Sequence, residues 1–282
     1  MPESNPLRFS DLAPLRQSVG AWRRAGERVV LVPTMGALHV GHLALVAEAR
    51  RIGRRVVASI FVNPTQFGPS EDFSRYPRDV EADLALLGQA GADAAWTPAV
   101  ETMYPPGFAT RIDVAGLTDG LCGPFRPGHF SGVATVVTKL LNQVGPDVAL
   151  FGEKDFQQLR VIQQAVADLD LAVEIRGVPT VREADGLALS SRNRYLMPEE
   201  RAVAPRLHAV LAGIAAAARG GSPVAGPVAD GRAALEAAGF EVQYLAVCDT
   251  RTLAQVERVE APARVLAAAF LGRTRLIDNV AV

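Results

Sequence analysis

The sequence predicts an α/β fold, a parallel β-sheet covered by helices on both faces, followed by a smaller α+β domain. Over residues 1–180, short apolar runs rich in β-branched residues alternate with stretches whose apolar residues recur at helical spacing. After about Pro179 the order changes to helices followed by strands. Alternating buried strands and helices are typical of a parallel sheet, whereas segregated ones are typical of an α+β unit.

The first domain is expected to contain five strands, at residues 28–32, 55–62, 93–96, 147–151 and 174–178. Helices are expected between them, where apolar residues return every three or four positions, at residues 41–50, 79–91 and 156–167. Ligands of such sheets bind at the carboxyl ends of the strands. The loops after Val32, Val62, Phe151 and Val181 are therefore the places to look for chemistry.

The second domain is expected to begin with one long helix over residues 198–218. A flexible Gly- and Pro-rich connection and a second helix follow, at residues 220–227 and 228–238. Three strands, at residues 241–247, 264–270 and 275–280, complete the unit. With a boundary near residue 180, the pattern predicts domains of residues 1–180 and 181–282.

Composition and charge exclude several classes of protein. The 282 residues are 49% hydrophobic, which is enough to build cores and excludes wholesale disorder. Lys and Arg number 29 against 30 Asp and Glu, so the chain lacks the positive field expected of a protein that binds nucleic acid or anionic lipid. No stretch predicts a membrane span or a secretory leader. The two cysteines, Cys122 and Cys248, form no CxxC motif, so we expect no disulfide and a cytoplasmic location.

The loop after the first strand carries two histidines. Gly36 and Gly41 have the spacing of a phosphate-binding P-loop, but His42 follows where that motif needs lysine. His39 and His42 are three residues apart and would share one face of a helix N-terminus, beside backbone N–H groups and the positive end of the helix dipole. This arrangement suits a triphosphate. Capping or packing is the alternative role for each histidine, and zinc binding is disfavoured because a third ligand is missing.

Lysine is rare in this chain. Of the 29 basic residues, only Lys139 and Lys154 are lysines. Lys154 follows a predicted strand in a glycine-containing turn, where a compact ammonium can act as a point charge on a phosphate. The alternative is a lysine that merely lies on a solvated surface.

Five segments resemble the motifs of a known family. Residues 34–42 resemble the HxGH signature of the class I synthetase and nucleotidyltransferase superfamily. The remaining four resemble, in order, motifs of the pantothenate synthetase (pantoate–β-alanine ligase) family, namely residues 60–67, 126–133, 152–159 and 185–193. The resemblance covers nearly the whole chain. Phe156 departs from it, since an aromatic residue with a hydroxyl is common there.

The resemblance implies a Rossmann-like nucleotide-binding domain with a C-terminal α+β lid domain. It also implies ATP-dependent condensation of (R)-pantoate with β-alanine to pantothenate, AMP and pyrophosphate through an enzyme-bound pantoyl-adenylate. Mg²⁺ is expected with ATP, held mainly by phosphates and water. We assign no protein ligand to the metal, although Asp83 is a candidate. A homodimer is expected from the family.

The resemblance also implies site residues. The expected catalytic residues are His39, His42, Lys154 and Arg192, with His42 as the proton donor. The expected ATP-binding residues are Met35, Gly36, Ala37, Leu38, His39, Val40, Gly41, His42, Gly152, Glu153, Lys154, Asp155, Val181, Leu189, Ser190, Ser191 and Arg192. Pantoate is expected to contact Gln66, Gln158 and Asn63, and Gln66 also faces β-alanine. Residues 189–192 resemble the mobile KMSKS-type loop, and a polar interdomain turn is the alternative.

Some assignments stay open at this point. Arg126 and His129 either face the substrate carboxylates or order a loop. The other glutamines of the predicted helix, Gln157, Gln163 and Gln164, are expected to be solvated. Competing functions are a nucleotidyltransferase that stops after AMP transfer and a nucleotide sensor without turnover. RNA binding is disfavoured by the balanced charge.

Overall fold

The computed structural model describes residues 5–69, 71 and 73–282, which divide into two compact units. The first unit contains the residues up to Val114, Arg126–Glu153 and Val161–Pro179. The second unit contains Ala115–Phe125, Lys154–Arg160 and Thr180–Val282. Two segments that precede residue 180 thus pack with the C-terminal part of the chain. The division into domains 1–180 and 181–282 stays a prediction.

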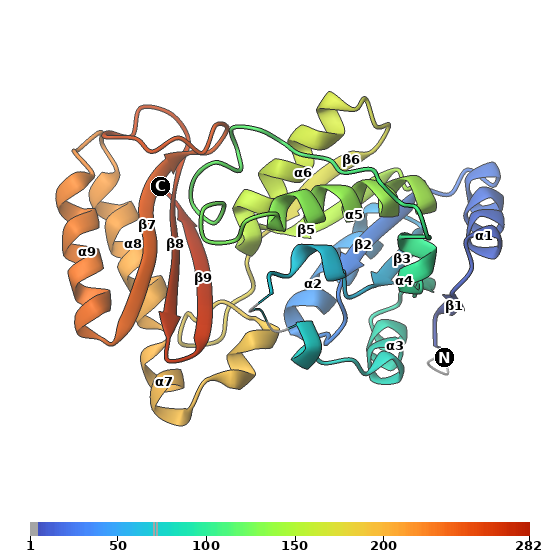
Figure 1. Ribbon diagram of the computed structural model, residues 1–282, viewed down its shortest axis with the longest axis horizontal. Coiled ribbons are helices and arrows are strands. Elements are labelled where there is room, and N and C mark those ends of the chain that lie inside the picture. Colours follow the sequence, from blue (N-terminus) through green and yellow to red (C-terminus); the bar gives the residue numbers. More distant parts are fainter. Residues whose placement is uncertain (1–4, 70, 72) are drawn as a thin grey trace. The chain divides into compact units, whose positions relative to one another are not determined.

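The first unit is built on a six-stranded sheet in which every pairing is parallel (Figure 1). Its strands lie in the order β1 (Leu7–Phe9), β4 (Ala94–Trp96), β3 (Arg55–Ile60), β2 (Val29–Thr34), β5 (Val148–Gly152) and β6 (Glu174–Val178). From β2 the chain continues through β3 and β4 toward one edge of the sheet. The later strands β5 and β6 lie on the other side of β2. The predicted parallel α/β architecture is confirmed, and the strand order reverses between β2 and β5.

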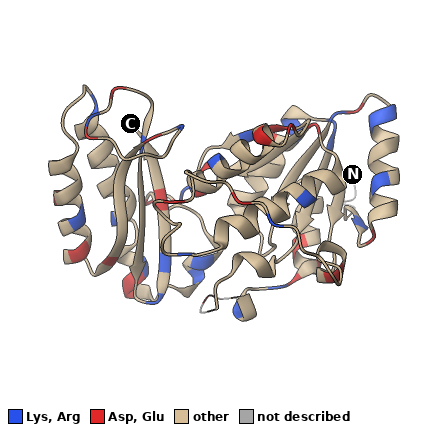
Figure 2. Cartoon of the chain, turned by 45° about the horizontal axis from the view of Figure 1, so that its top comes forward, with Lys and Arg blue, Asp and Glu red and all other residues tan. Residues whose placement is uncertain are grey.

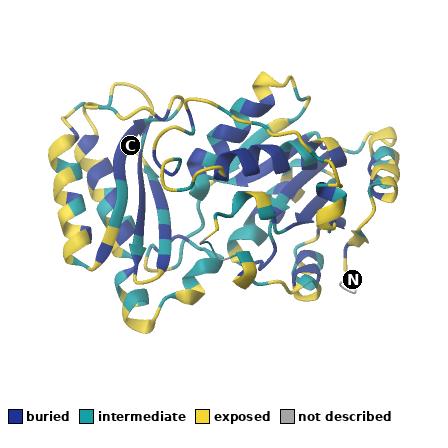
Figure 3. Cartoon of the chain, viewed as in Figure 1, coloured by how far each residue is buried: buried dark blue, intermediate teal, exposed yellow. Residues whose placement is uncertain are grey.

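Helices bury both faces of this sheet. On one face, α2 (Val40–Ile52) and α3 (Val80–Gln89) pack Val46 and Leu87 against strand residues such as Val30, and all three are fully buried. On the other face, the α5 (His129–Val144) side chain of Gln143 accepts a hydrogen bond from Trp96 Nε1 at 3.0 Å, and α1 (Leu12–Arg24) packs beside α5. The central strands and most of α5 are buried (Figure 3). Burial on both faces explains why the strands are continuous apolar runs.

The second unit is an α+β structure. Its antiparallel sheet has the order β7 (Phe240–Asp249), β8 (Ala263–Leu271) and β9 (Thr274–Ala281). The helices α7 (Pro198–Val203), α8 (Arg206–Ala218) and α9 (Ala225–Ala237) accompany it. Leu211 of α8 and Leu235 of α9 share one core with Val265 of β8, and all three are fully buried. The predicted α+β unit is confirmed.

Several elements differ from the prediction. The single helix expected over residues 198–218 is two helices, α7 and α8, which are separated at Pro205 because proline lacks the N–H that would continue the first helix. The prediction also missed α1, α5, the short edge strand β1 and the one-turn helix α4 (Val100–Met103). The start of α5 lies in a Gly- and Pro-rich segment, whose composition is typical of a loop. The helix α6 (Phe156–Asp168), whose residues up to Arg160 belong to the second unit, lies where a helix was expected.

Both cysteines are buried in the second unit and neither forms a disulfide, as predicted. Burial raises the pKa of the Cys248 thiol to about 12. A thiol with such a pKa is protonated at neutral pH and is a poor nucleophile.

Charged side chains of both signs are distributed over both units (Figure 2). Many pair at the surface, for example Arg8 with Glu81 at 2.9 Å and Arg28 with Glu174 at 3.0 Å. Exposed pairs of this kind contribute little to stability. Among the described residues, no helix has both the length and the apolar character needed to cross a membrane.

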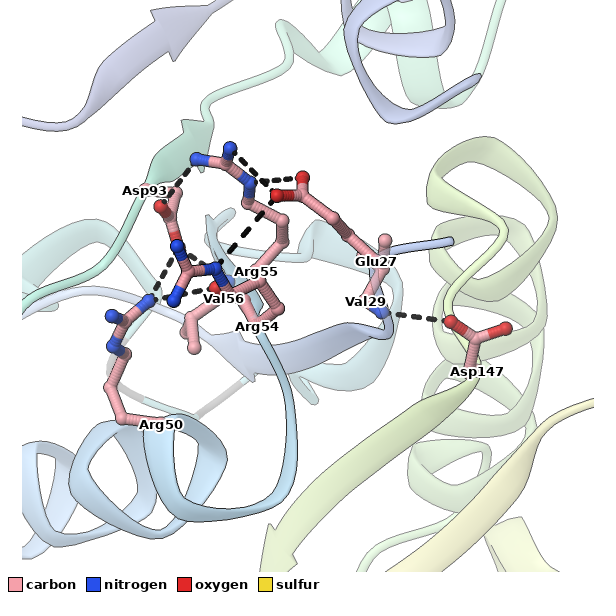
Figure 4. A network of polar contacts seen from close by, with 8 residues as sticks. All are labelled: Glu27, Val29, Arg50, Arg54, Arg55, Val56, Asp93 and Asp147. Atoms are coloured by element: carbon pink, nitrogen blue, oxygen red, sulfur yellow. Dashed lines mark hydrogen bonds and ion pairs between the residues drawn. The ribbon is translucent and has the colours of Figure 1, made fainter. Parts of the chain in front are cut away.

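Carboxylates close the amino-terminal edge of the sheet (Figure 4). Asp147 Oδ2 accepts the Val29 N–H at the start of β2, and Asp93 Oδ2 accepts the Val56 N–H in β3, both at 2.8 Å. Asp93 also accepts hydrogen bonds from Arg55 at 3.0 Å. These bonds satisfy strand donors that lack a sheet partner. The opposite, carboxyl edge is left to the loops.

We expect Asp93→Ala to lower the free energy of unfolding by about 1–3 kcal/mol, because it leaves the buried Val56 N–H without an acceptor. Urea unfolding followed by circular dichroism measures the change. Asp93→Asn is the control, since it keeps an oxygen for Val56 and should lose less. Equal stability of the alanine variant and the parent chain would contradict this account.

Candidate active site

The predicted site residues of the first unit lie on loops at the carboxyl edge of the sheet. β2 ends at Thr34 and leads into the segment 35–39, whereas β3 ends at Ile60 and leads into the 3₁₀ turn Pro64–Gln66. β5, the neighbour of β2 on its other side, ends at Gly152. The strand order reverses between β2 and β5, and ligands of open parallel sheets bind at such a point.

The two histidines cap helix α2 reciprocally. His39 is the N-cap residue, and its Nδ1 accepts the Gly41 N–H at 3.1 Å. His42 lies at the third helical position, and its Nδ1 accepts the His39 N–H at 3.3 Å. The ring centroids are 4.1 Å apart. The capping role considered for these residues is therefore present, and it satisfies backbone donors that the first turn of a helix leaves unpaired.

Capping fixes the chemical form of both rings. A ring nitrogen that accepts a hydrogen bond cannot carry a proton, so each neutral imidazole has its proton on Nε2. Each Nε2–H is then a donor on the side of the ring opposite the bonded backbone. Together with the positive end of the α2 dipole, two such donors suit a phosphate or another anion.

Asp83 of α3 holds the loop that precedes the histidines. Its carboxylate is 4% exposed and accepts the N–H groups of Ala37 and Leu38 at 3.0 and 2.8 Å. Gly36 has a φ of +81°, and a Cβ there would lie 2.7 Å from Asp83 Oδ2, so only glycine fits. Both carboxylate oxygens are engaged in the loop. Asp83 is therefore a loop-positioning residue in this structure, and its candidate role as a metal ligand stays a prediction.

Asn63 orients Gln66. Asn63 is 1% exposed, and its Nδ2 donates to Gln66 Oε1 at 3.0 Å and to the Gly132 carbonyl at 3.2 Å. Its Oδ1 accepts the Tyr104 hydroxyl at 2.7 Å. The Gln66 amide nitrogen then faces Met35 Sδ at 3.2 Å, which links the loops after β2 and β3. We assign Asn63 to the positioning of Gln66, and a direct contact of Asn63 with substrate stays a prediction.

The start of α5 supports the same turn. A Cβ at Gly132 would overlap the Thr65 carbonyl oxygen, so the absence of a side chain lets α5 approach the turn. His129, 8% exposed, contacts the Gln66 carbonyl oxygen through Nδ1 at 2.9 Å. Arg126 Nη1 lies 2.9 Å from His129 Nε2.

Arg126 also binds Glu71 through two hydrogen bonds of 2.7 Å. Burial alone would raise the pKa of Glu71, but the Arg126 guanidinium outweighs burial and holds that pKa below its ordinary value. Of the two roles left open for Arg126 and His129, this structure favours loop ordering.

Lys154 belongs to the second unit. It lies in the 3₁₀ turn Glu153–Asp155, two residues after the end of β5. Its side chain is 19% exposed, with Nζ 3.8 Å from Asp155 Oδ2. Gln158 follows on α6. Binding of one nucleotide by Lys154 together with His39 and His42 stays a prediction.

The structure brings Val181 next to the start of the predicted mobile loop, residues 189–192. The Leu189 N–H donates to the Val181 carbonyl at 3.0 Å. Ser190 then caps the turn Ser191–Tyr195, with its Oγ accepting the Arg192 N–H at 3.2 Å. Residues predicted to bind one nucleotide from separate positions, Val181 and 189–192, are thus neighbours.

The expectation of a solvated Gln157 is wrong. Gln157 is 5% exposed, its Oε1 accepts the Cys122 N–H at 3.0 Å, and its Nε2 donates to the carbonyls of Leu117 and Gly120 at 2.9 Å each. It anchors the segment 115–125 to α6. Sequence reasoning also missed the roles of Asp83 and Tyr104. Their partners lie more than 40 positions away, and no local pattern signals such contacts.

We expect Asp83→Ala to speed hydrogen exchange of the Ala37 and Leu38 amides, because both lose their acceptor. Mass spectrometry of peptides that cover this loop measures the rates. The matched control is Asp79→Ala, which removes the N-cap of the same helix without touching the loop. Unchanged exchange in the Asp83 variant, or equal acceleration in both variants, would contradict the role of Asp83.

Comparison with known proteins identifies the family of the chain. The family described as Pantoate-beta-alanine ligase matches residues 8–281. The pantothenate synthetase of Paramagnetospirillum magneticum is 58% identical over 272 residues, 96% of each chain, and that of Acidiphilium cryptum is 62% identical over 255 residues, 90% of this chain and 92% of the relative.

Solved structures give the same result. The pantothenate synthetase of Thermus thermophilus superposes with a TM-score of 0.91 at 51% identity, covering 97% of this chain and 98% of the other. The pantoate-beta-alanine ligase of Francisella tularensis, whose structure is described as a complex with beta-gamma ATP and beta-alanine, superposes with a TM-score of 0.83 at 31% identity, covering 98% and 97%. The chain therefore belongs to the pantoate–β-alanine ligase family.

Proposed function

We propose that this chain joins pantoate to β-alanine with ATP through a pantoyl-adenylate. In the first step a pantoate carboxylate oxygen attacks the α-phosphorus of ATP, and pyrophosphate leaves. In the second step the amine of β-alanine attacks the acyl carbon, AMP leaves and the amine loses a proton to solvent. Family membership supports this reaction, as does the relative described with ATP and β-alanine.

The observation that carries the proposal is the reciprocal capping of His39 and His42. Attack of a carboxylate on a phosphate brings two anions together, so the site must offset negative charge at the phosphorus. Both rings are held with Nε2–H as the donor before any ligand arrives. In the proposal these groups donate hydrogen bonds to phosphate oxygens, and His42, the residue expected as proton donor, donates its Nε2–H hydrogen bond to the leaving pyrophosphate.

The other nucleotide-binding groups of the proposal belong to the second unit. The Lys154 ammonium offsets charge on the α-phosphate and the pantoate carboxylate, and Asp155 accepts from the ribose hydroxyls. Ser190, Ser191 and Arg192 contact the β- and γ-phosphates from a closing loop. Exclusion of water supports this role, because an acyl-adenylate is prone to hydrolysis.

Pantoate needs hydrogen-bonding groups beside apolar walls. Gln66 and Gln158 are the proposed pantoate-binding amides, and Gln66 also faces β-alanine. The hydrogen bond from Asn63 fixes which end of the Gln66 amide donates, which supports an oriented contact with a hydroxyl or carboxylate.

Mg²⁺ is proposed to arrive with ATP and to be held by phosphate oxygens and water. The described residues contain no cluster of three or more His, Cys, Asp or Glu side chains suited to a metal. Asp83, the candidate ligand, uses both oxygens on backbone N–H groups. No step above depends on a protein ligand to the metal. The homodimer expected from the family is also part of the proposal, and light scattering of the purified chain tests it.

Incubation of the enzyme with ATP, Mg²⁺ and pantoate, without β-alanine, should release about one equivalent of pyrophosphate and leave pantoyl-adenylate on the enzyme. Quenched-flow sampling and mass spectrometry measure both products, and β-alanine should then convert the adenylate to pantothenate. Absence of pyrophosphate would favour a nucleotide sensor. An adenylate that β-alanine does not discharge would favour a nucleotidyltransferase.

Substitution of His42 or Lys154 by alanine should slow pyrophosphate release by on the order of 10²–10³-fold, because each removes a group that stabilises developing charge. Discharge of preformed adenylate by β-alanine should change less. Single-turnover rates of the two half-reactions measure the difference. Equal loss in both half-reactions would contradict a role in the first step.

Loss of the helix cap could itself disturb α2, so His39→Asn provides the matched control. Asparagine is a good N-cap residue and keeps an acceptor for the first turn, but it lacks the Nε2–H. We expect His39→Asn to keep the parent melting temperature and to lose rate in the first half-reaction. A variant with the parent rate would show that His39 serves as a cap alone.

A further inference from the structure

Asn279 in β9 is hydrogen-bonded to the turn that carries Lys154. It is 3% exposed, and its Nδ2 donates to the Lys154 carbonyl oxygen at 3.0 Å. Its Oδ1 accepts a hydrogen bond from Arg264 Nη1. The arginine is only a donor, so it fixes the amide with the nitrogen toward Lys154.

The main chain at Asn279 is held as well. The Asn279 N–H donates to Asp278 Oδ1 at 2.7 Å, and Asp278 is 4% exposed. Arg182 binds both carboxylate oxygens of Asp278, at 2.7 and 2.9 Å, and also donates to the Asn279 carbonyl at 3.2 Å. A bidentate ion pair to a buried carboxylate has a defined geometry. Asn279 thus presents its amide from a fixed support.

Arg264 contacts the same segment at a second point. Its guanidinium lies over the Phe156 ring, 4.3 Å from the centroid. Two neighbouring strands of the second unit, β8 and β9, therefore hold the segment 154–156 through a side-chain amide and through a stacked guanidinium. This agrees with the grouping of Lys154–Arg160 with the second unit.

We propose that Asn279 is a positioning residue for Lys154, acting through the main chain of the turn. The inference rests on the proposed function, in which the Lys154 ammonium acts on a phosphate. A long side chain reaches a defined point only if its own Cα is fixed, and the hydrogen bond to the Lys154 carbonyl fixes the adjoining peptide. Displacement of a reacting group by about 1 Å can cost about 10²-fold in rate.

The test measures single-turnover pyrophosphate release from ATP and pantoate by the full-length enzyme. Asn279→Ala removes the amide, whereas Asn279→Asp keeps an oxygen for Arg264 and replaces the donor to Lys154 by a carboxylate oxygen. Both variants should be slower by about 10- to 100-fold. The matched control is Val280→Ala, which weakens the core from the next position of the same strand and should change the rate by less than about 3-fold. Melting temperatures of all variants are recorded beside the rates.

A double-mutant cycle separates positioning from general support of the fold. In a Lys154→Ala background, Asn279→Ala should cause less than about 2-fold further loss, because the group it positions is already gone. If the rate losses of the two single variants multiply in the double variant, the proposal is overturned. Parent rates in the Asn279 variants would also overturn it. Loss of the fold in both Asn279 variants would also overturn it, since Asn279 would then be purely structural. Failure of the proposed function is distinct, because the parent enzyme would itself release no pyrophosphate.

Discussion

The hydrogen bonds that His39 and His42 accept at the start of α2 are the interaction on which the site depends. They begin the helix and place the proton of each neutral ring on Nε2. Asp83 extends this order into the preceding loop by accepting the N–H groups of Ala37 and Leu38. In the proposed function, capping and anion binding are one arrangement, since the cap uses Nδ1 of each ring and the contacts with phosphate use Nε2.

The two edges of the parallel sheet have different tasks. At the amino edge, Asp93 and Asp147 accept strand N–H groups and the loops are closed by ion pairs (Figure 4). At the carboxyl edge, polar side chains of the loops hydrogen-bond to one another, as Asn63 does to Gln66. Stability and chemistry are thereby assigned to opposite ends of the same strands, so a substitution at one end should leave the other largely unaffected.

The parts of this molecule that are encoded locally could be predicted from the sequence. Continuous apolar runs predicted β2, β3 and β5, and the turn residues placed both histidines at a helix start. What failed depended on distant partners. Gln157 looks like a solvated helix residue until the segment 115–125 packs on it, and the helix over 129–144 begins among residues typical of a loop. Propensity and spacing carry no information about such contacts, whereas the family resemblance supplied site residues without explaining what holds them.

Lys154 joins two kinds of constraint. Along the chain it follows β5 by two residues, so its turn starts at the strand end where the sheet order reverses. In space its carbonyl is bound by Asn279 of β9, within the unit that also carries residues 189–192. If the lysine acts on phosphate, the second unit does more than contribute a loop, because its buried Arg182–Asp278 pair supports the strand that holds a catalytic group. The hydrogen bonds of Arg182, Asp278 and Asn279 then set where the ammonium can lie, and a change in them can alter the first half-reaction without touching a nucleotide.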